Sequence, residues 1–424
     1  MKIAVIGSGG REHALAWKLS QSRHTEKLYA VPGNPGMADI AECVSGIDIE
    51  DNDAIVKFAK DKEIDLVVIG PEVPLTNGVV DALSAEGIKA FGPTGKAAEL
   101  EGSKVYAKLV MKRYGIPTAR YEVFGDAGRA RVYVRQMRQP FAIKADGLAA
   151  GKGVILTKDA DEAVAAIDTI MTDKAFGEAG SRVVIEEFMQ GEEASVLAFT
   201  DGKTIVPMVP SQDHKAVYDG DKGPNTGGMG TYAPAPVITP DIMDRVKKEI
   251  LEPMVEAMNK EGRPYKGCLY AGLMITDKGP KVVEFNARFG DPETQVVLPL
   301  LKSDLVEVML ACIDGTLDKT PIEWSDGAAV CVVMASGGYP RSYEKGKEIT
   351  GLDAAKADGD IVFHAGTKNV DGKIVTNGGR VLGVVGQAEN IKAAVDKAYE
   401  GVKKISFDKE YHRTDIAHRA LERL

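Results

Sequence analysis

KVVEFNARFGDPE, at Lys281–Glu293, is a strand pattern that runs into a turn of charged residues. Its first half alternates as a β-strand does, which predicts that Val283 and Phe285 lie on one face. Glu284 and Asn286 then share the opposite face, and a carboxylate beside an amide oxygen is an ordinary pair of ligands for Mg²⁺. A buried strand that meets a solvated turn would give the same short pattern, so the motif gains weight only from other parts of the chain.

The end of this stretch brings further charges to the same place. Arg288 stands at the predicted strand end, and Gly290-Asp291-Pro292-Glu293 follows it. Glycine and proline favour a tight turn, which would re-aim the two acids of this segment. The sequence therefore predicts one strand end that carries a basic group and several acidic groups.

Composition and charge exclude several classes of protein. The chain has 424 residues, which is too long for one ordinary core and predicts several domains. Of its residues, 44% are hydrophobic and 27% charged. Its net charge of −9 argues against nucleic acid or an anionic membrane as the main partner. No apolar run approaches membrane-spanning length, and the N-terminus runs directly into a strand with no room for a signal peptide. The cysteines form no C-x-x-C motif, so we expect free thiols in a reducing cytoplasm. We also expect a monomer that acts on small molecules.

The first ninety residues alternate between short apolar strands and helical patterns. This rhythm predicts a doubly wound parallel sheet with helices on both faces. After the first strand, Gly7-Ser8-Gly9-Gly10-Arg11-Glu12-His13 forms a loop that opens a helix, whose free N–H groups suit an anion. The predicted strands are Ile3–Ile6, Leu28–Val31, Leu66–Ile69 and Ile88–Phe91.

A dinucleotide site is the first alternative for this loop, and two observations oppose it. Glu12 stands where the third glycine of G-x-G-x-x-G is needed, and the second strand runs into Val31–Gly36 without an acid for the ribose. A smaller phosphorylated molecule, with Arg11 or His13 nearby, fits better. For His13 a helix-capping or core position is an equal alternative.

The middle of the chain carries the pattern of a polyphosphate site. Lys144 ends an apolar strand, and the loop Ala145–Val154 is rich in glycine and alanine, as a flap over phosphates would be. The spacing is not that of the P-loop. Lys104 lies in the first turn of a helix predicted at 103–114, where a cation is unfavourable unless an anion binds nearby. The strand Arg182–Phe188 could bind adenine and ribose, or could be an acidic hairpin end at the surface.

Two further regions complete the chain. Val209–Pro236 has too much glycine and proline for a regular element, and its mixture of Asp, His, Lys and Asn favours function. The segment from about Ala328 onward is predicted as a separate α/β unit that serves as scaffold or as one wall of a cleft.

Taken together, Ile143-Lys144, the glycine-rich flap, Ile185–Phe188 and Glu284-Phe285-Asn286 resemble the ATP-grasp ligases. More narrowly, Gly9–His13, Ala145–Val154, Pro224–Gly230 and Arg288–Glu293 resemble the phosphoribosylamine–glycine ligase family. The resemblance covers the chain end to end. It implies an ATP-grasp fold with an N-terminal substrate domain (1–102), an ATP-grasp domain (103–327) with a small lid (about 120–190), and a C-terminal α/β domain (328–424).

The resemblance also implies a reaction of purine synthesis and a set of site residues. Glycine, ATP and 5-phosphoribosylamine would give glycinamide ribonucleotide, ADP and phosphate through a glycyl phosphate, with Mg²⁺ or Mn²⁺ bound. The ATP residues implied are Lys104, Lys144, Gly151, Gly153, Glu186, Glu187, Phe188 and Glu193, and the metal ligands are Glu284 and Asn286. Arg288, Asp291, Asp213 and His214 would be catalytic. Gly9, Gly10, Arg11, His13, Lys215, Asn225, Thr226 and Gly290 would contact substrate.

Three rival functions make different predictions. A sister ATP-grasp enzyme, such as a biotin carboxylase or another purine-pathway ligase, would share the ATP residues and differ at Pro224–Gly230 and Arg11–His13. A Rossmann oxidoreductase would need the missing ribose acid. A non-catalytic nucleotide sensor would keep Lys144 without needing Glu284 and Arg288 together.

Overall fold

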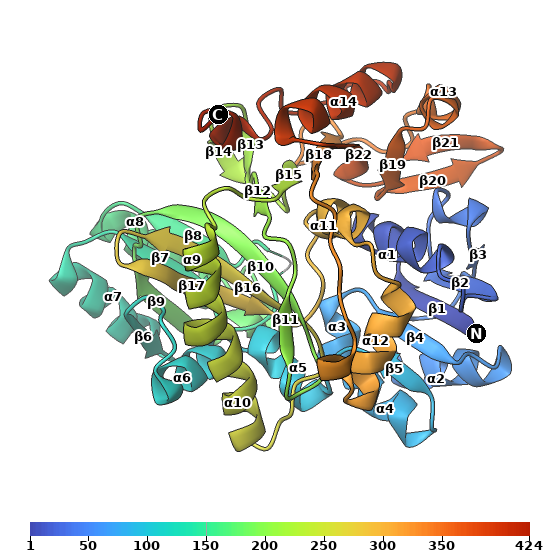
Figure 1. The fold of residues 1–424 in the computed structure, drawn as a ribbon. Helices are drawn as coiled ribbons and strands as arrows, with labels where there is room; N and C mark the ends of the chain where they lie inside the picture. Colours follow the sequence, from blue (N-terminus) through green and yellow to red (C-terminus); the bar gives the residue numbers. More distant parts are fainter. Residues whose placement is uncertain (150) are drawn as a thin grey trace.

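The N-terminal part of the chain is a five-stranded parallel sheet. The computed structural model describes residues 1–149 and 151–424. The sheet order is β3-β2-β1-β4-β5, and all four predicted strands are present in it. Helices cover both faces of this sheet, as Figure 1 shows, so its strands consist of buried aliphatic residues. The elements are β1 (Lys2–Gly7), α1 (Gly10–Ser20), β2 (Lys27–Pro32), β3 (Glu42–Cys43), α2 (Asn52–Asp61), β4 (Leu66–Ile69), α3 (Glu72–Thr76), α4 (Val79–Ala85) and β5 (Lys89–Phe91).

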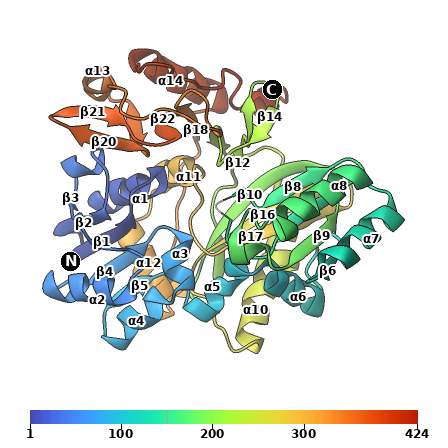
Figure 2. The same ribbon diagram turned by 180° about the vertical axis from the view of Figure 1, so that it is seen from behind.

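Two helices lead from this sheet to a small four-stranded unit. The helix predicted at 103–114 is α6, which Ser103 caps and Gly115, at φ 68°, ends. The small unit has strand order β6-β9-β7-β8 and its own core against α7 and α8, and it projects at one side of the molecule (Figure 2). Its elements follow α5 (Gly95–Gly102) and α6 (Lys104–Tyr114) and are β6 (Tyr121–Phe124), α7 (Ala127–Met137), β7 (Phe141–Ala145), β8 (Val154–Thr157), α8 (Ala160–Ile167) and β9 (Val183–Glu187).

The central sheet carries the opening motif. Its order is β11-β10-β16-β17, and its long antiparallel pairs place β17 at the edge that faces the small unit. A helical segment from Pro240 to Lys260 packs against it. The elements are β10 (Glu192–Thr200), β11 (Ile205–Pro207), α9 (Pro240–Arg245), a π-helical turn (Val246–Leu251), α10 (Glu252–Lys260), β16 (Gly267–Thr276), β17 (Gly279–Asn286), α11 (Thr294–Leu300) and α12 (Leu305–Asp314).

The C-terminal unit borrows strands from the middle of the chain. Its sheet order is β12-β15-β18-β22-β19, so the segment predicted to lack regular elements contributes two strands to it. That prediction failed for β15 because its pairing depends on a distant partner, β18, which local composition does not reveal. The same segment also forms a local hairpin, β13–β14. The elements are β12 (Gln212–Asp213), β13 (Ala216–Tyr218), β14 (Lys222–Asn225), β15 (Gly230–Ala233), β18 (Ala328–Ala335), α13 (Leu352–Ala357), β19 (Ile361–His364), β20 (Thr367–Val370), β21 (Lys373–Thr376), β22 (Arg380–Ala388), α14 (Ile391–Lys404) and α15 (His418–Leu421).

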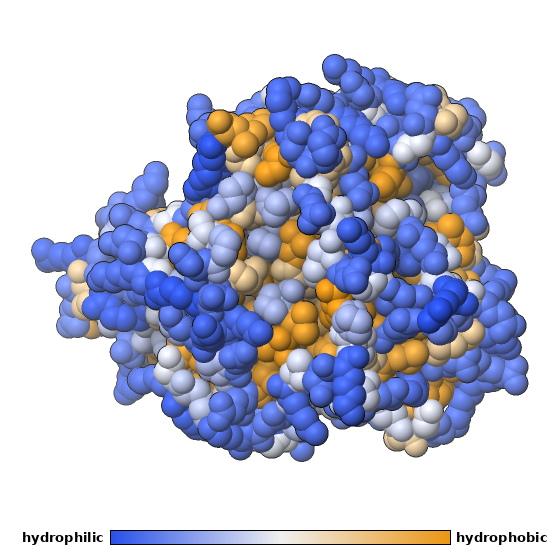
Figure 3. All heavy atoms as spheres, viewed as in Figure 1, coloured by the Kyte–Doolittle hydropathy of each residue, from blue (hydrophilic) through white to orange (hydrophobic). Residues whose placement is uncertain are grey.

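The surface is largely polar around these units. Hydrophilic residues cover most of the face in Figure 3, and hydrophobic ones gather toward its middle, where the units meet. Among the helices of the described residues, none is both long enough and apolar enough to span a bilayer.

Candidate active site

A bulge in β17 shapes the opening motif. Pairing with β16 shifts so that Leu273 faces Val282 while Gly272 faces Glu284, which leaves Val283 as an extra residue. Val282, fully buried, therefore joins Phe285 in the core. The prediction that Val283 and Phe285 lie on one face is wrong, because the bulge breaks the period of two on which it rested.

Beyond the bulge the pairing is regular, so Glu284 and Asn286 project to the same face. Burial disfavours the charged form of Glu284, but Lys215 and Lys104, with two further cations, outweigh it and lower the pKa of this carboxyl. Asn286 is buried, and its Oδ1 accepts from Arg288 Nη2 at 3.5 Å. An ionised carboxylate and an amide oxygen on one face fit a hard divalent cation, which takes oxygen ligands.

Lys144 meets this strand from the small unit. Its Nζ donates to the carbonyl of Val283, the bulged residue, at 3.0 Å, and lies 3.1 Å from Glu186 Oε2. Lys104 Nζ contacts the carbonyl of Gly147, and burial lowers the pKa of Lys104. The structure thus places both predicted phosphate lysines beside Glu284.

The predicted adenine and ribose residues differ in their surroundings. Glu186 is almost fully buried between lysines, whereas the side chain of Phe188 is 44% exposed. Glu187 accepts from Arg120 Nε at 2.9 Å, and Glu193 is held by Lys215 Nζ at 2.6 Å. Of these four residues, Phe188 is the one whose side chain, an exposed aromatic ring, could cover a base.

The flap is described except for one residue. Ala150, within the predicted flap, lies outside the described residues. Gly151 adopts φ +74°, a conformation that L side chains rarely adopt. Gly153 accepts from the amide of Ala145 at 2.8 Å, which closes the β7–β8 turn, and a Cβ on Gly153 would lie 2.6 Å from that of Ala149. Both glycines are therefore required by the shape of this turn.

A small pocket joins Glu284 to the segment 213–215. Asp213 and Lys215 line it together with Ser195 and Tyr270. Burial and the nearby carboxylates of Glu293 and Glu193 outweigh Lys215 and raise the pKa of Asp213 to about 7. The remaining lining residues are Glu193, Ala194, Gly272, Leu273 and Val283.

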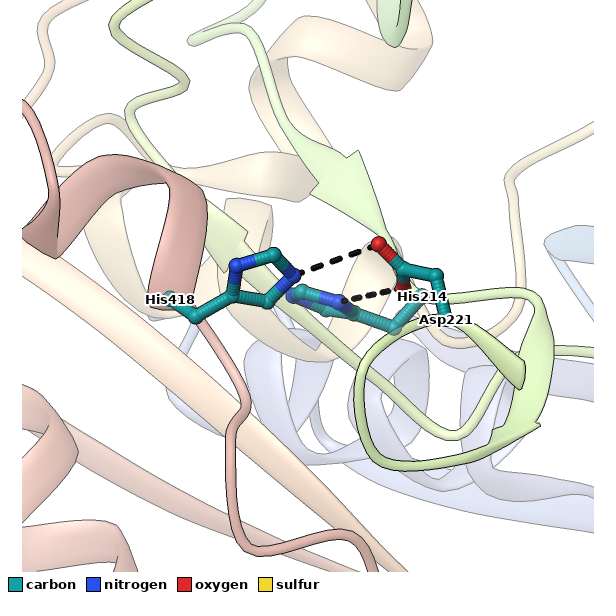
Figure 4. Close-up of side chains that lie close together, drawn as sticks. All are labelled: His214, Asp221 and His418. Carbon is teal, nitrogen blue, oxygen red and sulfur yellow. Dashed lines mark hydrogen bonds and ion pairs between the residues drawn. The ribbon is translucent and has the colours of Figure 1, made fainter.

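His214 points the other way. Successive side chains of a strand alternate, so Asp213 on the pocket side sends His214 to the opposite side. There its Nε2 accepts from the amide of Ala417 at 3.0 Å, and Asp221 and His418 lie close by, as Figure 4 shows. Burial lowers the pKa of His214 and keeps the ring neutral. The structure does not bring this predicted catalytic residue to the pocket.

The cluster of His214, Asp221 and His418 has the residue types of a metal site, but its bonds argue otherwise. Because the amide of Ala417 donates to Nε2 of His214, the proton of the neutral ring is on Nδ1, the atom that a metal would need. Two guanidinium groups also neutralise Asp221: Arg413 at 3.0 Å and Arg419 at 2.7 Å. The cluster is an ion-pair network that docks the chain's end onto the β13–β14 hairpin.

Arg288 sits among carboxylates at the end of β17. Its Nη2 lies 3.0 Å from Glu101 and its Nε 3.4 Å from Glu72, and these acids raise its pKa against the cost of burial. Glu101 also accepts from the amide of Ala287 at 2.6 Å. A charged group held in this way is fixed in direction.

The turn after Arg288 is tied to other units. Asp291 accepts from Gln295 Nε2 at 2.9 Å, and Arg380 lies 3.5 Å from its carboxylate, which helps to lower the pKa of Asp291 despite burial. Gly290 packs against Glu293, whose carboxylate accepts from the hydroxyl of Tyr270 at 2.6 Å.

Some of the hydrogen-bonding groups of the N-terminal loop are already paired within the loop. The carboxylate of Glu12 accepts from the amide of Gly9 at 2.7 Å and pairs with Arg11 Nε at 2.5 Å. Gly10 begins α1 and packs against Gln295. The acid that stands in the third glycine position thus occupies one amide predicted for substrate phosphate, and it also engages the neighbouring arginine.

His13 belongs to an interface, as its core alternative predicted. Its Nδ1 accepts from the amide of His364 at 2.8 Å, and its ring packs edge-on against Phe363. Burial, with His364 nearby, lowers the pKa of His13 to about 3. The structure therefore places His13 between the N-terminal and C-terminal units and not in the loop's open side.

The glycine-rich segment 223–230 is fixed from both sides. Thr226 donates its hydroxyl to the carbonyl of Lys215 at 2.8 Å, and Asn225 is exposed at the end of β14. Arg380 donates to the carbonyl of Gly227 at 2.8 Å, and Tyr339 accepts from the amide of the same glycine at 3.0 Å.

Sequence reasoning missed several residues of this region. Arg380 and Tyr339 come from the C-terminal unit, which was predicted only as scaffold or as one wall of a cleft. Lys108 lies four residues after Lys104 on the buried face of α6, and that helical spacing was the available signal. Tyr270 on β16 reaches both Ser195 and Glu293 by its hydroxyl.

The small unit places lysines beside the acid-bearing strand β17 of the central sheet. This arrangement of two α/β units defines the class of ATP-grasp enzymes. Solved biotin carboxylases share the fold: that of Campylobacter jejuni, in complex with β,γ-ATP, has a TM-score of 0.71 at 16% identity and covers 97% of this chain and 92% of that one. The chain belongs to the phosphoribosylglycinamide synthetase family. Models of its N domain, ATP-grasp (A) domain and C domain match residues 1–101, 102–294 and 329–419.

Individual relatives agree with this family. The phosphoribosylamine–glycine ligase of Halalkalibacterium halodurans is 52% identical over 99% of this chain and 97% of its own length. The trifunctional purine biosynthetic protein adenosine-3 of Gallus gallus is 53% identical over 99% of this chain, which spans 42% of that longer protein. The crystal structure of the phosphoribosylamine–glycine ligase of Thermotoga maritima has a TM-score of 0.87 at 36% identity, covering 98% of this chain and all of that one.

Proposed function

We propose that this protein joins glycine to 5-phosphoribosylamine with cleavage of ATP to ADP and phosphate, as a step of de novo purine synthesis. The observation that carries the proposal is the position of Glu284, which borders the Asp213 pocket and at the same time faces Lys104 and Lys144. A phosphate site and a small charged pocket therefore meet at one carboxylate. The identity of the substrates is inferred from the relatives, which are phosphoribosylamine–glycine ligases.

The first chemical step makes glycine an electrophile. A glycine carboxylate oxygen attacks the γ-phosphorus of ATP, the bond to the β–γ bridging oxygen breaks, and ADP leaves with that electron pair. Lys104 and Lys144 position the phosphates, and Arg288, fixed by its carboxylate partners, faces the transferred group. Glu284 and Asn286 would hold Mg²⁺ or Mn²⁺, which supplies neutralisation of phosphate charge when bound.

The second step forms the amide. The amine of phosphoribosylamine attacks the carbonyl carbon of glycyl phosphate, the carbon–oxygen bond breaks, and phosphate leaves. The amine nitrogen must lose a proton, and Asp213, with a pKa of about 7, is suited to accept it near neutral pH. Asp291, Lys215, Asn225 and the N-terminal loop remain our candidates for substrate contact.

The wider expectations follow from the same proposal. We propose the division 1–102, 103–327 and 328–424, with strands β12 and β15 contributed across the last boundary. We propose a monomer in the cytoplasm, where the four unpaired cysteines would remain reduced.

The test is an omission assay on purified protein. Phosphate release from ATP is measured with glycine, phosphoribosylamine and divalent metal, and then with each left out in turn. We expect release only when all are present. Turnover without glycine, or with bicarbonate in its place, would contradict the proposal and favour a carboxylase-type activity.

A further inference from the structure

Lys108 shares a buried carboxylate with Lys144. Its Nζ lies 3.1 Å from Glu186 Oε1, while Lys144 Nζ lies 3.1 Å from Oε2 of the same group. All three side chains are 4% exposed or less. One negative charge thus stands between two positive charges, and the group carries a net charge of +1 when all three are ionised.

Both lysines are also tied to the bulge before Glu284. Lys108 Nζ donates to the hydroxyl oxygen of Thr118 at 2.7 Å, and that hydroxyl donates to the carbonyl of Val282 at 2.7 Å. Lys144 Nζ donates to the carbonyl of the next residue, Val283, at 3.0 Å. The two ammonium groups therefore bridge α6 and β7 to consecutive carbonyls of β17.

The charge of Glu186 decides what Lys144 can bind. In a buried site an ion pair is strong, so Glu186 alone would neutralise Lys144 and weaken its attraction for a phosphate. Lys108 contacts the other carboxylate oxygen, Oε1, which has no aligned hydrogen bond, so this contact acts mainly through charge. Burial outweighs the attraction of Glu186 and lowers the pKa of Lys108 to about 8, so Lys108 still carries its charge near pH 7.

We propose that Lys108 is a positioning residue for the nucleotide: it balances Glu186 and so leaves the ammonium of Lys144 available to a phosphate group. This inference rests on the proposed ATP-dependent activity. It assigns no contact between Lys108 and the nucleotide, because Thr118 and Glu186 already occupy its ammonium group.

A double-mutant cycle tests the inference. Lys108→Met should raise KM for ATP on the order of tenfold, or about 1.4 kcal/mol, and leave KM for glycine within about twofold. In a Glu186→Gln background, which lacks the charge to be balanced, the same substitution should change KM for ATP by less than about twofold. Equilibrium titration with ADP should show the same pattern. Lys112→Met, an exposed lysine one turn further along α6, is the matched control and should change nothing.

The cycle separates the alternatives. If Lys108→Met raises KM for ATP by the same factor in both backgrounds, Lys108 acts by itself, and the inference is wrong. No change in either background overturns it as well. Lys108→Gln makes the same change of charge and replaces the methionine variant if that one does not fold. Absence of glycine-dependent turnover in the unmodified protein would instead defeat the proposed function.

Discussion

The cleft around Glu284 and the contacts of the C-terminal unit both use polar residues from sequence motifs, but in opposite ways. At the cleft, charged side chains from several elements converge, and Lys108 and Lys144 each lie 3.1 Å from the one carboxylate of Glu186. At the C-terminal contacts, His13 and His214 are buried, neutral and bonded to backbone amides. A buried group needs partners if it is to stay ionised. A neutral imidazole needs only a hydrogen bond from one backbone amide, and it can then have a purely structural role. The comparison separates functional candidates from interface residues.

The largest expected effect is at the cleft. Glu284→Ala should lower turnover by roughly 10²–10³-fold or more, because it removes a group that organises charge on the phosphates. Turnover is measured by phosphate release at saturating ATP. Asp277→Ala, an exposed acid in the turn of the same hairpin, is the control and should retain full activity. Near-full activity of the Glu284 variant would remove this residue from the metal site.

A smaller effect is expected at Asp213. Because its pKa is raised to about 7, the ionised form accumulates as pH rises, so kcat/KM for glycine should increase through pH 7 and then level off. Asp213→Asn should lower kcat/KM by roughly 10²-fold and abolish this inflection. A profile from pH 6 to 9 measures both. If the inflection persists in the variant, another group is responsible for it.

At the interface the expected effect is on stability. His13 and His364 have pKa values lowered to about 3 and about 4, while the unfolded chain binds protons near pH 6.5. Stability from these rings is present above pH 6.5 and is lost as pH falls toward the folded values. For each ring, the free energy of unfolding should fall by about 2 kcal/mol as pH is lowered from 6.5 to 5. In urea unfolding, His13→Asn should show a shallower fall over this range, and an unchanged slope would contradict the assignment.

The smallest effect on activity is expected at His214. Since its ring faces Ala417 and not the pocket, His214→Asn should change kcat/KM for glycine by less than about threefold, within about 0.6 kcal/mol. Thermal unfolding of the same variant should show destabilisation, because a fully buried ring is lost. A large loss of activity in a stably folded variant would return His214 to the reaction.

Much of the fold was predictable from local pattern. The four N-terminal strands and the helix over 103–114 all appear, because each has a continuous apolar run or clear end signals. Strand β15 was not predictable, since its partner β18 lies about a hundred residues away, and β12 joins the sheet only through β15; both have the composition of a loop. The bulge at Val283 was hidden for a related reason, because it exists only in the pairing of β17 with β16.

The amino-acid sequence by itself determined the class of protein and the residue types of the site, because long motifs of lysine, glycine, acid and amide carry that chemistry in their order. Tertiary structure alone decided which of those residues face one another. It turned Glu284 toward three lysines, turned His13 and His214 into interfaces, and brought Lys108 and Arg380 to places that no motif indicated. The physical reason is that charge and burial act through space, and the distances that govern them are set by packing between segments far apart in the chain.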